Sequence, residues 1–391
     1  MNSKFPFYSK LCLLSISYLS LGLILPAMSL IVTSKGFSLP YLGIAMMCMS
    51  ISVMVFEVPS GILCDAKGRR MSFHLSMIFT FIGTSLLFSS SFFILCIGFA
   101  LTGIGRAFGS GSLDALLIEE TQDSGGNIAD TLFSLEIVSS LSLAIGALIG
   151  GYLLTLGAAG SFLTHHVLGG RMILIGINIV LIPLLIAKES KKETSHKVST
   201  QVSLLFHGLT HQPQIIAYIV TVVIQGVFLS SIETYWQPYL KKILQNDGEL
   251  WILGVVASSI FLISILGSWI GKLLLPYISA QKIYIGLFII DLLLIACLGR
   301  THSVSLFFFL FLLIYILLGA LSIAGSTLLN QRLDNSLRSS VLSLSSFSLQ
   351  GGAILSSLSS VIILSYTNIS GFWVIVAVFG IVVLLATYTR M

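Results

Sequence analysis

Residues 304 to 329 form an uninterrupted stretch in which no side chain carries a charge and most are leucine, isoleucine or phenylalanine. As a helix this stretch would be about 39 Å long, more than the roughly 30 Å of a bilayer's hydrocarbon core. Charged residues make up only 9% of the whole chain, against about 25% in ordinary globular domains. The sequence therefore predicts an all-α integral membrane protein and excludes a water-exposed globular fold.

Twelve apolar runs of this kind, separated by charge, glycine or proline, define the predicted membrane-spanning helices. They cover residues 11–33, 40–63, 71–90, 92–119, 129–157, 172–187, 214–240, 251–275, 282–299, 304–329, 338–365 and 370–389. The two least distinct divisions lie near Ser90 and near Asn368. The first run is too long for the apolar core of a cleaved signal peptide, so we interpret it as the first span.

The basic residues predict the orientation of these spans. With both termini in the cytoplasm, the inner side receives Lys4, Lys10, Lys67, Arg69, Arg70, Lys188, Lys191, Lys192, Lys197, Lys272, Lys282, Arg332, Arg338 and Arg390. The outer side receives only Lys35, Arg171, Lys241, Lys242 and Arg300, while Arg106 falls within a helix. This bias matches the positive-inside rule and explains the net charge of +5 without a nucleic-acid partner. We expect a multi-pass protein of a bacterial-type inner membrane.

A hydrophilic segment divides the predicted spans into two sets of six. Residues 188–213 read as a cytoplasmic linker between halves formed by residues 1–187 and 214–391. The segments TLFSLEIVSS, from residue 131, and SVLSLSSFSL, from residue 340, are similar to each other and each opens a span. Equal span counts and this short match favour two pseudo-symmetric halves with a solute site between them at mid-depth.

One cytoplasmic loop carries a family signature. The sequence Gly61-Ile-Leu-Cys-Asp65-Ala-Lys-Gly68-Arg69-Arg70 lies between the second and third spans and resembles the GxxxDxxGRR/K motif of the major facilitator superfamily. The segments at 109–120, 233–240 and 330–344 resemble small bacterial twelve-helix permeases, in a branch similar to drug and solute exporters. The resemblance implies the twelve-helix major facilitator fold and solute transport by rocking of the two halves.

The resemblance also implies a conformational switch at this loop. Asp65 and Arg69 would help to lock the halves together in the outward-open state. Glu119 stands where the family places an acid that contacts the loop, whereas Glu120 is expected to be a solvated charge at a helix end.

Simple sterics assigns roles to the other residues of the loop. Gly61 would let a neighbouring helix approach closely, and Gly68 would permit a tight turn. Basic residues at an anionic inner surface also enforce topology, so Lys67, Arg69 and Arg70 have that role as an alternative to a switch.

Charged residues within the spans are candidates for proton coupling, because each costs about 3 kcal/mol near the bilayer centre. The candidates are Glu57, Arg106, Asp114 and Glu136. On one continuous helix, Arg106 and Asp114 would be about 12 Å apart along the axis and rotated by about 80°, which excludes a close pair. For Glu57 and Glu136 the alternative is a structural partnership with a cation.

The segment around Arg106, GIGRAFGSGS, resembles the arginine-and-glycine signature of proton-coupled drug antiporters. Arginine near a carboxylate favours its charged form, whereas burial favours the neutral form, and a coupling site needs that balance. Glycines at 103, 105, 109 and 111 imitate a phosphate-binding loop on paper. Within a membrane helix they are expected to serve packing, so no nucleotide is expected.

The seventh span carries the candidates for solute binding. Glu233 has Gln237 one turn away and Gln225 two turns before it, with aromatic neighbours Tyr235 and Trp236. Such a face could bind an organic cation or a polar solute, although tryptophan and tyrosine also act as interfacial anchors. Asp291, in the ninth span, is either lipid-facing, locally paired or functional.

Other features limit the interpretation. The segment Ser142 to Gly151 keeps three glycines of the exporters' GxxxGPxxGG signature but lacks its proline. The second-half copy of the loop signature, around Gly267, Gly271 and Lys272, is degenerate. Neither the five cysteines nor the histidines show metal-ligand spacing, and no catalytic motif appears, so no cofactor, metal or enzymatic site is expected.

The sequence thus predicts a monomeric secondary transporter that moves a small organic solute by alternating access, with proton-coupled export preferred. An uptake symporter for a metabolite is the alternative, and a membrane-embedded lipid-modifying enzyme or a transport-inactive sensor is the rival from another class. The sequence does not identify the solute.

Overall fold

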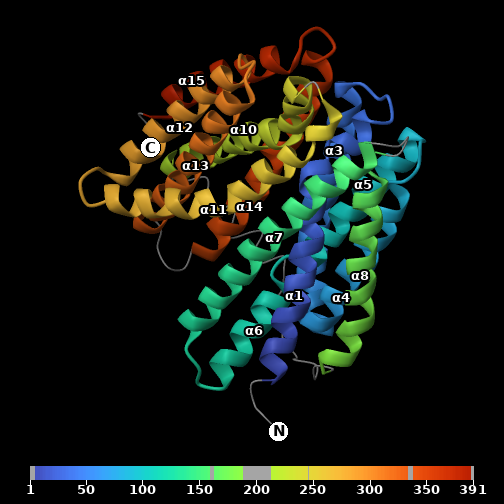
Figure 1. Ribbon diagram of the computed structural model, residues 1–391. Coiled ribbons are helices and arrows are strands. Elements are labelled where there is room, and N and C mark those ends of the chain that lie inside the picture. The colour runs from blue at the N-terminus through green and yellow to red at the C-terminus, as the bar shows by residue number, and fades with distance from the viewer. Residues whose placement is uncertain (1–4, 159–162, 188–212, 245, 333–337, 389–391) are drawn as a thin grey trace. The chain divides into compact units, whose positions relative to one another are not determined.

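A computed structural model describes residues 5–158, 163–187, 213–244, 246–332 and 338–388, and these are helical with short connections (Figure 1). The first half of the chain forms α1 (Phe5–Ile24), η1 (Leu25–Ala27), α2 (Leu30–Thr33), α3 (Leu39–Lys67), α4 (Arg69–Leu86), α5 (Phe92–Gly109), α6 (Ser112–Asp123), α7 (Ile128–Ala158) and α8 (His165–Leu185). The second forms α10 (Pro213–Leu244), η2 (Asp247–Glu249), α11 (Trp251–Leu274), α12 (Ala280–Leu298), α13 (Val304–Arg332), α14 (Arg338–Ile363) and α15 (Ile369–Tyr388).

The all-α membrane fold predicted from the sequence is confirmed. Among the described residues, 11 helical segments are long and apolar enough to cross a membrane. The one remaining predicted span, residues 71–90, corresponds to α4, an 18-residue helix that begins with Arg69 and Arg70. Both indistinct divisions are real, because α4 ends before Ser90 and α14 ends before Asn368. Except for Pro213, the predicted linker lies outside the described residues.

Two predicted spans are interrupted. The first is broken at Pro26, where α1 gives way to η1 and then α2. The fourth is divided at Ser110 and Gly111, because Gly111 has a φ of +65° and cannot continue a right-handed helix. The continuous helix assumed for Arg106 and Asp114 is therefore wrong, and Arg106 lies in the last turn of α5 whereas Asp114 lies in the first turn of α6.

Contacts divide the chain into two compact units. The N-terminal unit contains α1 to α8 and the beginning of α11, and the C-terminal unit contains α10, the rest of α11 and α12 to α15. Each is described separately below.

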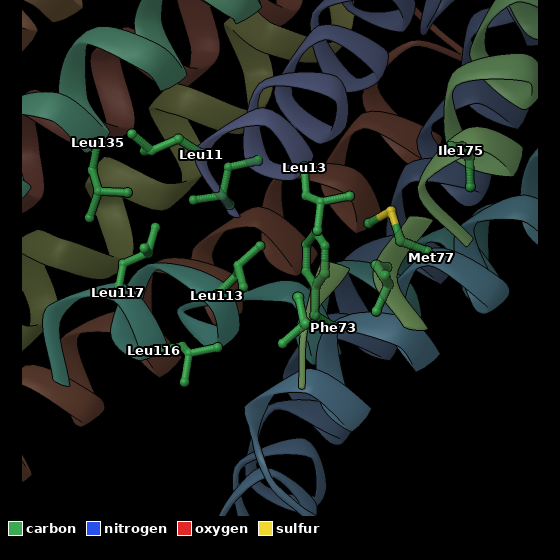
Figure 2. Packing of buried hydrophobic residues seen from close by; sticks show 12 residues of the cluster. Leu11, Leu13, Phe73, Met77, Leu113, Leu116, Leu117, Leu135 and Ile175 are labelled. Carbon is green, nitrogen blue, oxygen red and sulfur yellow. The ribbon is translucent and has the colours of Figure 1, made fainter. Parts of the chain in front are cut away.

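The N-terminal unit is organised around α1. A buried cluster joins α1, α4, α6 and α8 through Leu13, Phe73, Leu113, Leu117 and Ile175 (Figure 2). On its other side α1 meets α7 so closely that a Cβ at Gly150 would lie 2.1 Å from the Leu23 carbonyl oxygen. Small residues at this contact let the backbones approach, which is how membrane helices gain dispersion energy without a hydrophobic driving force between them. The glycines of the Ser142–Gly151 segment therefore pack helices even without the exporters' proline.

The C-terminal unit has an aromatic interior. Phe228 of α10 packs edge-on against Phe288 of α12, with ring centroids 5.9 Å apart. The Trp373 indole of α15 donates a hydrogen bond to the Ser231 carbonyl oxygen at 3.1 Å. Because aromatic side chains combine large apolar area with a polar atom that needs a partner, they specify which helices meet.

Candidate coupling and switch sites

The loop between α3 and α4 is held by a glycine and an ion pair. Gly68 has φ +91° and ψ 158°, a conformation available essentially only to glycine, and its N–H donates to the Cys64 carbonyl oxygen at 2.9 Å. The chain then enters α4 at Arg69, whose Nη2 and Nε donate to Glu119 Oε1 at 2.6 and 3.2 Å. The loop between α3 and α4 is thus tied to α6 within the N-terminal unit.

Other residues of the signature lie in more open positions. Gly61 is exposed, and a Cβ placed there would meet nothing within 4 Å, so no described helix of its own unit approaches it closely. Asp65 is exposed near the end of α3. Arg70 donates from Nη2 to the Pro183 carbonyl oxygen at 3.4 Å, which joins α4 to α8.

A second ion pair adds to the prediction for Glu120. Glu120 is exposed near the end of α6, as expected, and it also accepts hydrogen bonds from Lys10 of α1. Lys10 is only 5% exposed, so its ammonium group has lost most of its water and requires this partner. The sequence does not predict the pair, because Lys10 and Glu120 are far apart in the chain, Lys10 fits the positive-inside rule and Glu120 fits a solvated helix end.

Asp114 meets a tyrosine that the sequence did not single out. Tyr18 of α1 donates its hydroxyl hydrogen to Asp114 Oδ2 at 3.2 Å, and both side chains are partly buried. Glu136 of α7 is exposed, accepts from the Ser140 hydroxyl at 3.4 Å, and is near enough to interact electrostatically with Tyr18. Asp114, Tyr18 and Glu136 therefore form one polar neighbourhood contributed by α6, α1 and α7.

Arg106 and Glu57 lie on α5 and α3, which are not among the three helices that form this neighbourhood. Arg106 is exposed, and among the described residues no ion pair joins it to Asp114. Glu57 is partly exposed on α3, two residues before the helix-internal Pro59. One turn further, Ser60 donates to the carbonyl oxygens of Glu57, at 2.9 Å, and of Ala107 in α5, at 3.0 Å.

The solute-binding candidates of α10 occupy different environments within the C-terminal unit. Gln225 accepts a hydrogen bond from the Tyr284 hydroxyl of α12 at 3.4 Å. Glu233 is exposed, whereas Gln237 is only 3% exposed. Glu233 is thus the accessible acid of this helix.

The aromatic candidates beside Glu233 are core residues. Tyr235 is 1% exposed and donates to Ser360 Oγ at 2.7 Å, and Trp236 is 3% exposed and packs on Phe311 with ring centroids 5.3 Å apart. The open aromatic face expected around Glu233 is therefore not formed by these rings, because burying their large apolar surfaces against other helices is favoured.

Asp291 is neither lipid-facing nor locally paired. Its side chain is fully buried in α12, and neither carboxyl oxygen has a hydrogen-bond partner among the described residues. Spacing along α12 places it on the same face as Tyr284 and Phe288. The described residues contain no group of three potential metal ligands.

Two units of membrane-length helices define a polytopic helical membrane protein. The model of the Major Facilitator Superfamily matches residues 11–301, so the chain belongs to this superfamily. A curated relative, the uncharacterized MFS-type transporter YxaM of Bacillus subtilis (strain 168), is 22% identical over 240 residues. That alignment covers 59% of this chain and 58% of the relative.

Solved structures share the fold over nearly the full length. The nucleoside transporter NupG matches with a TM-score of 0.82 at 14% identity, covering 100% of this chain and 99% of NupG. An auto-inhibited peptide transporter of the POT family matches with a TM-score of 0.74 at 12% identity, covering 98% and 96%. A bacterial homologue of the lysosomal transporter Spinster matches with a TM-score of 0.71 at 13% identity, covering 100% and 95%. At these identities the likeness shows the fold alone.

Proposed function

We propose that this protein is a proton-coupled secondary transporter that exports a small organic solute by alternating access between two helical halves. The observation that carries the proposal is the Tyr18–Asp114 hydrogen bond at 3.2 Å, inside a membrane-spanning region and beside the break at Gly111. An acid kept within the membrane is costly, so a working role is its default interpretation.

Asp114 is suited to exchange its proton. A carboxyl group that is only partly buried can be reached by protons, and its tyrosine partner can donate to the charged form or be displaced from the neutral form. Gly111 frees the first turn of α6 from the helix before it, so Asp114 can change its environment without unwinding α5. Glu136, two turns into α7, is the neighbouring acid to which a proton could be passed.

Coupling then follows from competition. Solute binding favours the ionised carboxylate and releases a proton, and a proton that binds from the other side expels the solute. Only a ligand with different affinities for the two conformations shifts their populations. The proton on Asp114 can therefore act only if the surroundings of Asp114 differ between the two conformations. The Arg69–Glu119 pair would set which conformation is favoured, as the switch of one half.

The solute site is proposed to use the accessible polar groups of α10, Glu233 and Gln225. Gln225 is held by Tyr284, which fixes the amide orientation, and Glu233 offers a charge for a cationic or hydrogen-bonding solute. The buried rings of Tyr235 and Trp236 would hold α10 in place by packing against other helices.

A flux experiment tests both coupling and direction. Purified protein in liposomes is first screened for stabilisation by nucleosides, short peptides and organic cations, and hits are assayed under an imposed proton gradient. Export coupling predicts that protons moving one way drive solute the other way, and Asp114→Asn removes this drive but keeps solute exchange. Movement of solute and protons in the same direction would replace the proposal by the uptake symporter, and undiminished coupling in Asp114→Asn would remove the proton role of this residue.

A further inference from the structure

Among the described residues, no ion pair joins the buried Arg171 of the N-terminal unit to a carboxylate. Arg171 lies in α8 and is 5% exposed, and its Nε has no hydrogen-bond partner among the described residues. A guanidinium group stays protonated in proteins and accepts no hydrogen bonds, so it cannot avoid its cost by becoming neutral.

The other buried cation of this unit shows what is missing. Lys10, also 5% exposed, is matched by Glu120. Buried charges in proteins are normally paired or bound to an ion of opposite sign. Arg171 therefore needs a negative partner that the described side chains do not supply.

The register of the α4–α8 contact places a second unsatisfied group opposite Arg171. These helices run antiparallel, with Met77 Sδ 3.8 Å from Asn178 Nδ2. Thr84 lies seven residues after Met77 along α4, and Arg171 lies seven residues before Asn178 along α8. Seven residues make about two helical turns, so Thr84 and Arg171 lie on the same helix faces as Met77 and Asn178. Thr84 is fully buried and its Oγ1 also has no partner among the described residues.

The same register is supported on both sides. Phe81, one turn before Thr84, contacts the position of Gly176, and Phe88, one turn after it, packs on His165 with ring centroids 5.1 Å apart. The guanidinium group and the hydroxyl group are hydrogen-bond donors, and they lie at the same level of one interface. Two converging donors with one positive charge are complementary to a single anion.

From this arrangement we propose that Arg171 and Thr84 form a binding site for a small monovalent inorganic anion of the size of chloride, which ties α4 to α8. One guanidinium supplies one charge to be neutralised, which favours a monovalent ion. The site is lined by apolar residues, among them Leu168 and Ile175 on the Arg171 face of α8, and both are fully buried. A lipid phosphate would require an open path for its glycerol, and the two orphan atoms are closed to solvent.

The surroundings are favourable to an anion. Lys35 lies at the end of α4 nearest this site, where its ammonium donates to the carbonyl oxygens of Leu87 and, at 2.6 Å, Ser89. Burial lowers the pKa of Lys35 to about 8, so it is still mostly positive at neutral pH. This site is independent of the proposed coupling through Asp114.

Thermal unfolding of the purified full-length protein in detergent tests the site. In potassium chloride the melting temperature should be about 3 °C higher than in potassium gluconate of equal ionic strength, with a saturable dependence on chloride. Bromide should replace chloride, and sulfate should not. Arg171→Gln should abolish the shift, and Thr84→Val, which keeps shape and charge, should move its midpoint to higher chloride. Arg300→Gln, an exposed arginine of the C-terminal unit, is the matched control and should keep the full shift.

Two results would overturn the proposal. The first is an equal melting temperature of the wild type in chloride and gluconate. The second is a full chloride shift in Arg171→Gln. If Arg171→Gln folds poorly, Arg171→Met is the second test variant. Without chloride it should be more stable than the wild type, because it removes an uncompensated buried charge. An Arg171→Met protein whose melting temperature still rises with chloride would contradict the site.

Discussion

The two units use polar side chains in different ways. In the N-terminal unit, carboxylates meet cations or a tyrosine, in Lys10–Glu120, Arg69–Glu119 and Tyr18–Asp114. In the C-terminal unit the hydrogen bonds described above join neutral groups, in Tyr235–Ser360, Trp373–Ser231 and Tyr284–Gln225. Interactions of charged groups change with protonation and conformation, whereas neutral ones hold a fixed surface. We infer that the first unit carries coupling and switching and the second carries solute recognition.

Exchanging the acids of the two units for amides gives the largest expected contrast. Asp114→Asn should reduce gradient-driven solute flux by at least about 100-fold, the lower end of what a positioned proton-transfer group contributes. Asp291→Asn should leave the flux close to that of the wild type, because the Asp291 side chain on α12 is fully buried. Flux in liposomes under a fixed proton gradient is the measurement, and equal losses in both variants would break the division of roles.

Gly68, in the loop between α3 and α4, distinguishes the family signature of the first unit from its degenerate copy around Gly267 in the second unit. Gly68→Ala should destabilise the protein by about 2 kcal/mol, because its φ and ψ suit glycine alone. Gly61→Ala should be neutral or slightly stabilising, since a Cβ there has open space in a helix. In the second unit Gly267 instead lies in α11, where a Cβ would meet the Ile316 carbonyl oxygen at 2.0 Å. Denaturant unfolding compares the two variants, and equal stability of Gly68→Ala and Gly61→Ala would contradict the role of the turn.

The two ion pairs of the first unit should differ in strength. Glu120→Gln should cost about 2 kcal/mol, because it leaves the buried Lys10 without its charge partner. Glu119→Gln should cost about 0.5 kcal/mol, since the Arg69 and Glu119 side chains are 25% and 42% exposed. The measurement is the free energy of unfolding of each variant, and a larger loss in Glu119→Gln would reverse this ranking.

A neutral hydrogen bond of the second unit should contribute least. Tyr235→Phe should destabilise by about 1 kcal/mol, because it removes the bond to Ser360 but keeps the packing on Phe372. Tyr8→Phe, at a tyrosine that is 60% exposed, controls for the loss of a hydroxyl group. Thermal unfolding compares the two, and an equal effect would show that the buried bond adds nothing.

The helices could be predicted from the sequence because the bilayer imposes long apolar runs, and the runs were read directly from composition. The breaks at Pro26 and Gly111 were not predicted, since a local turn barely changes the hydropathy of a window. Tyr18 was missed because one tyrosine within a span carries no pattern of its own. In the sequence Lys10 and Arg171 cannot be told from ordinary topology charges, because burial depends on which helices pack together. Tyr235 and Trp236 were misplaced for the same reason.

The most direct test of the central claim is proton release on solute binding, measured with a pH-indicating dye on purified protein in weak buffer. The account predicts that a binding solute releases protons from the wild type and from Asp291→Asn but none from Asp114→Asn, although all three bind the solute. Release of the same number of protons by Asp114→Asn would contradict it.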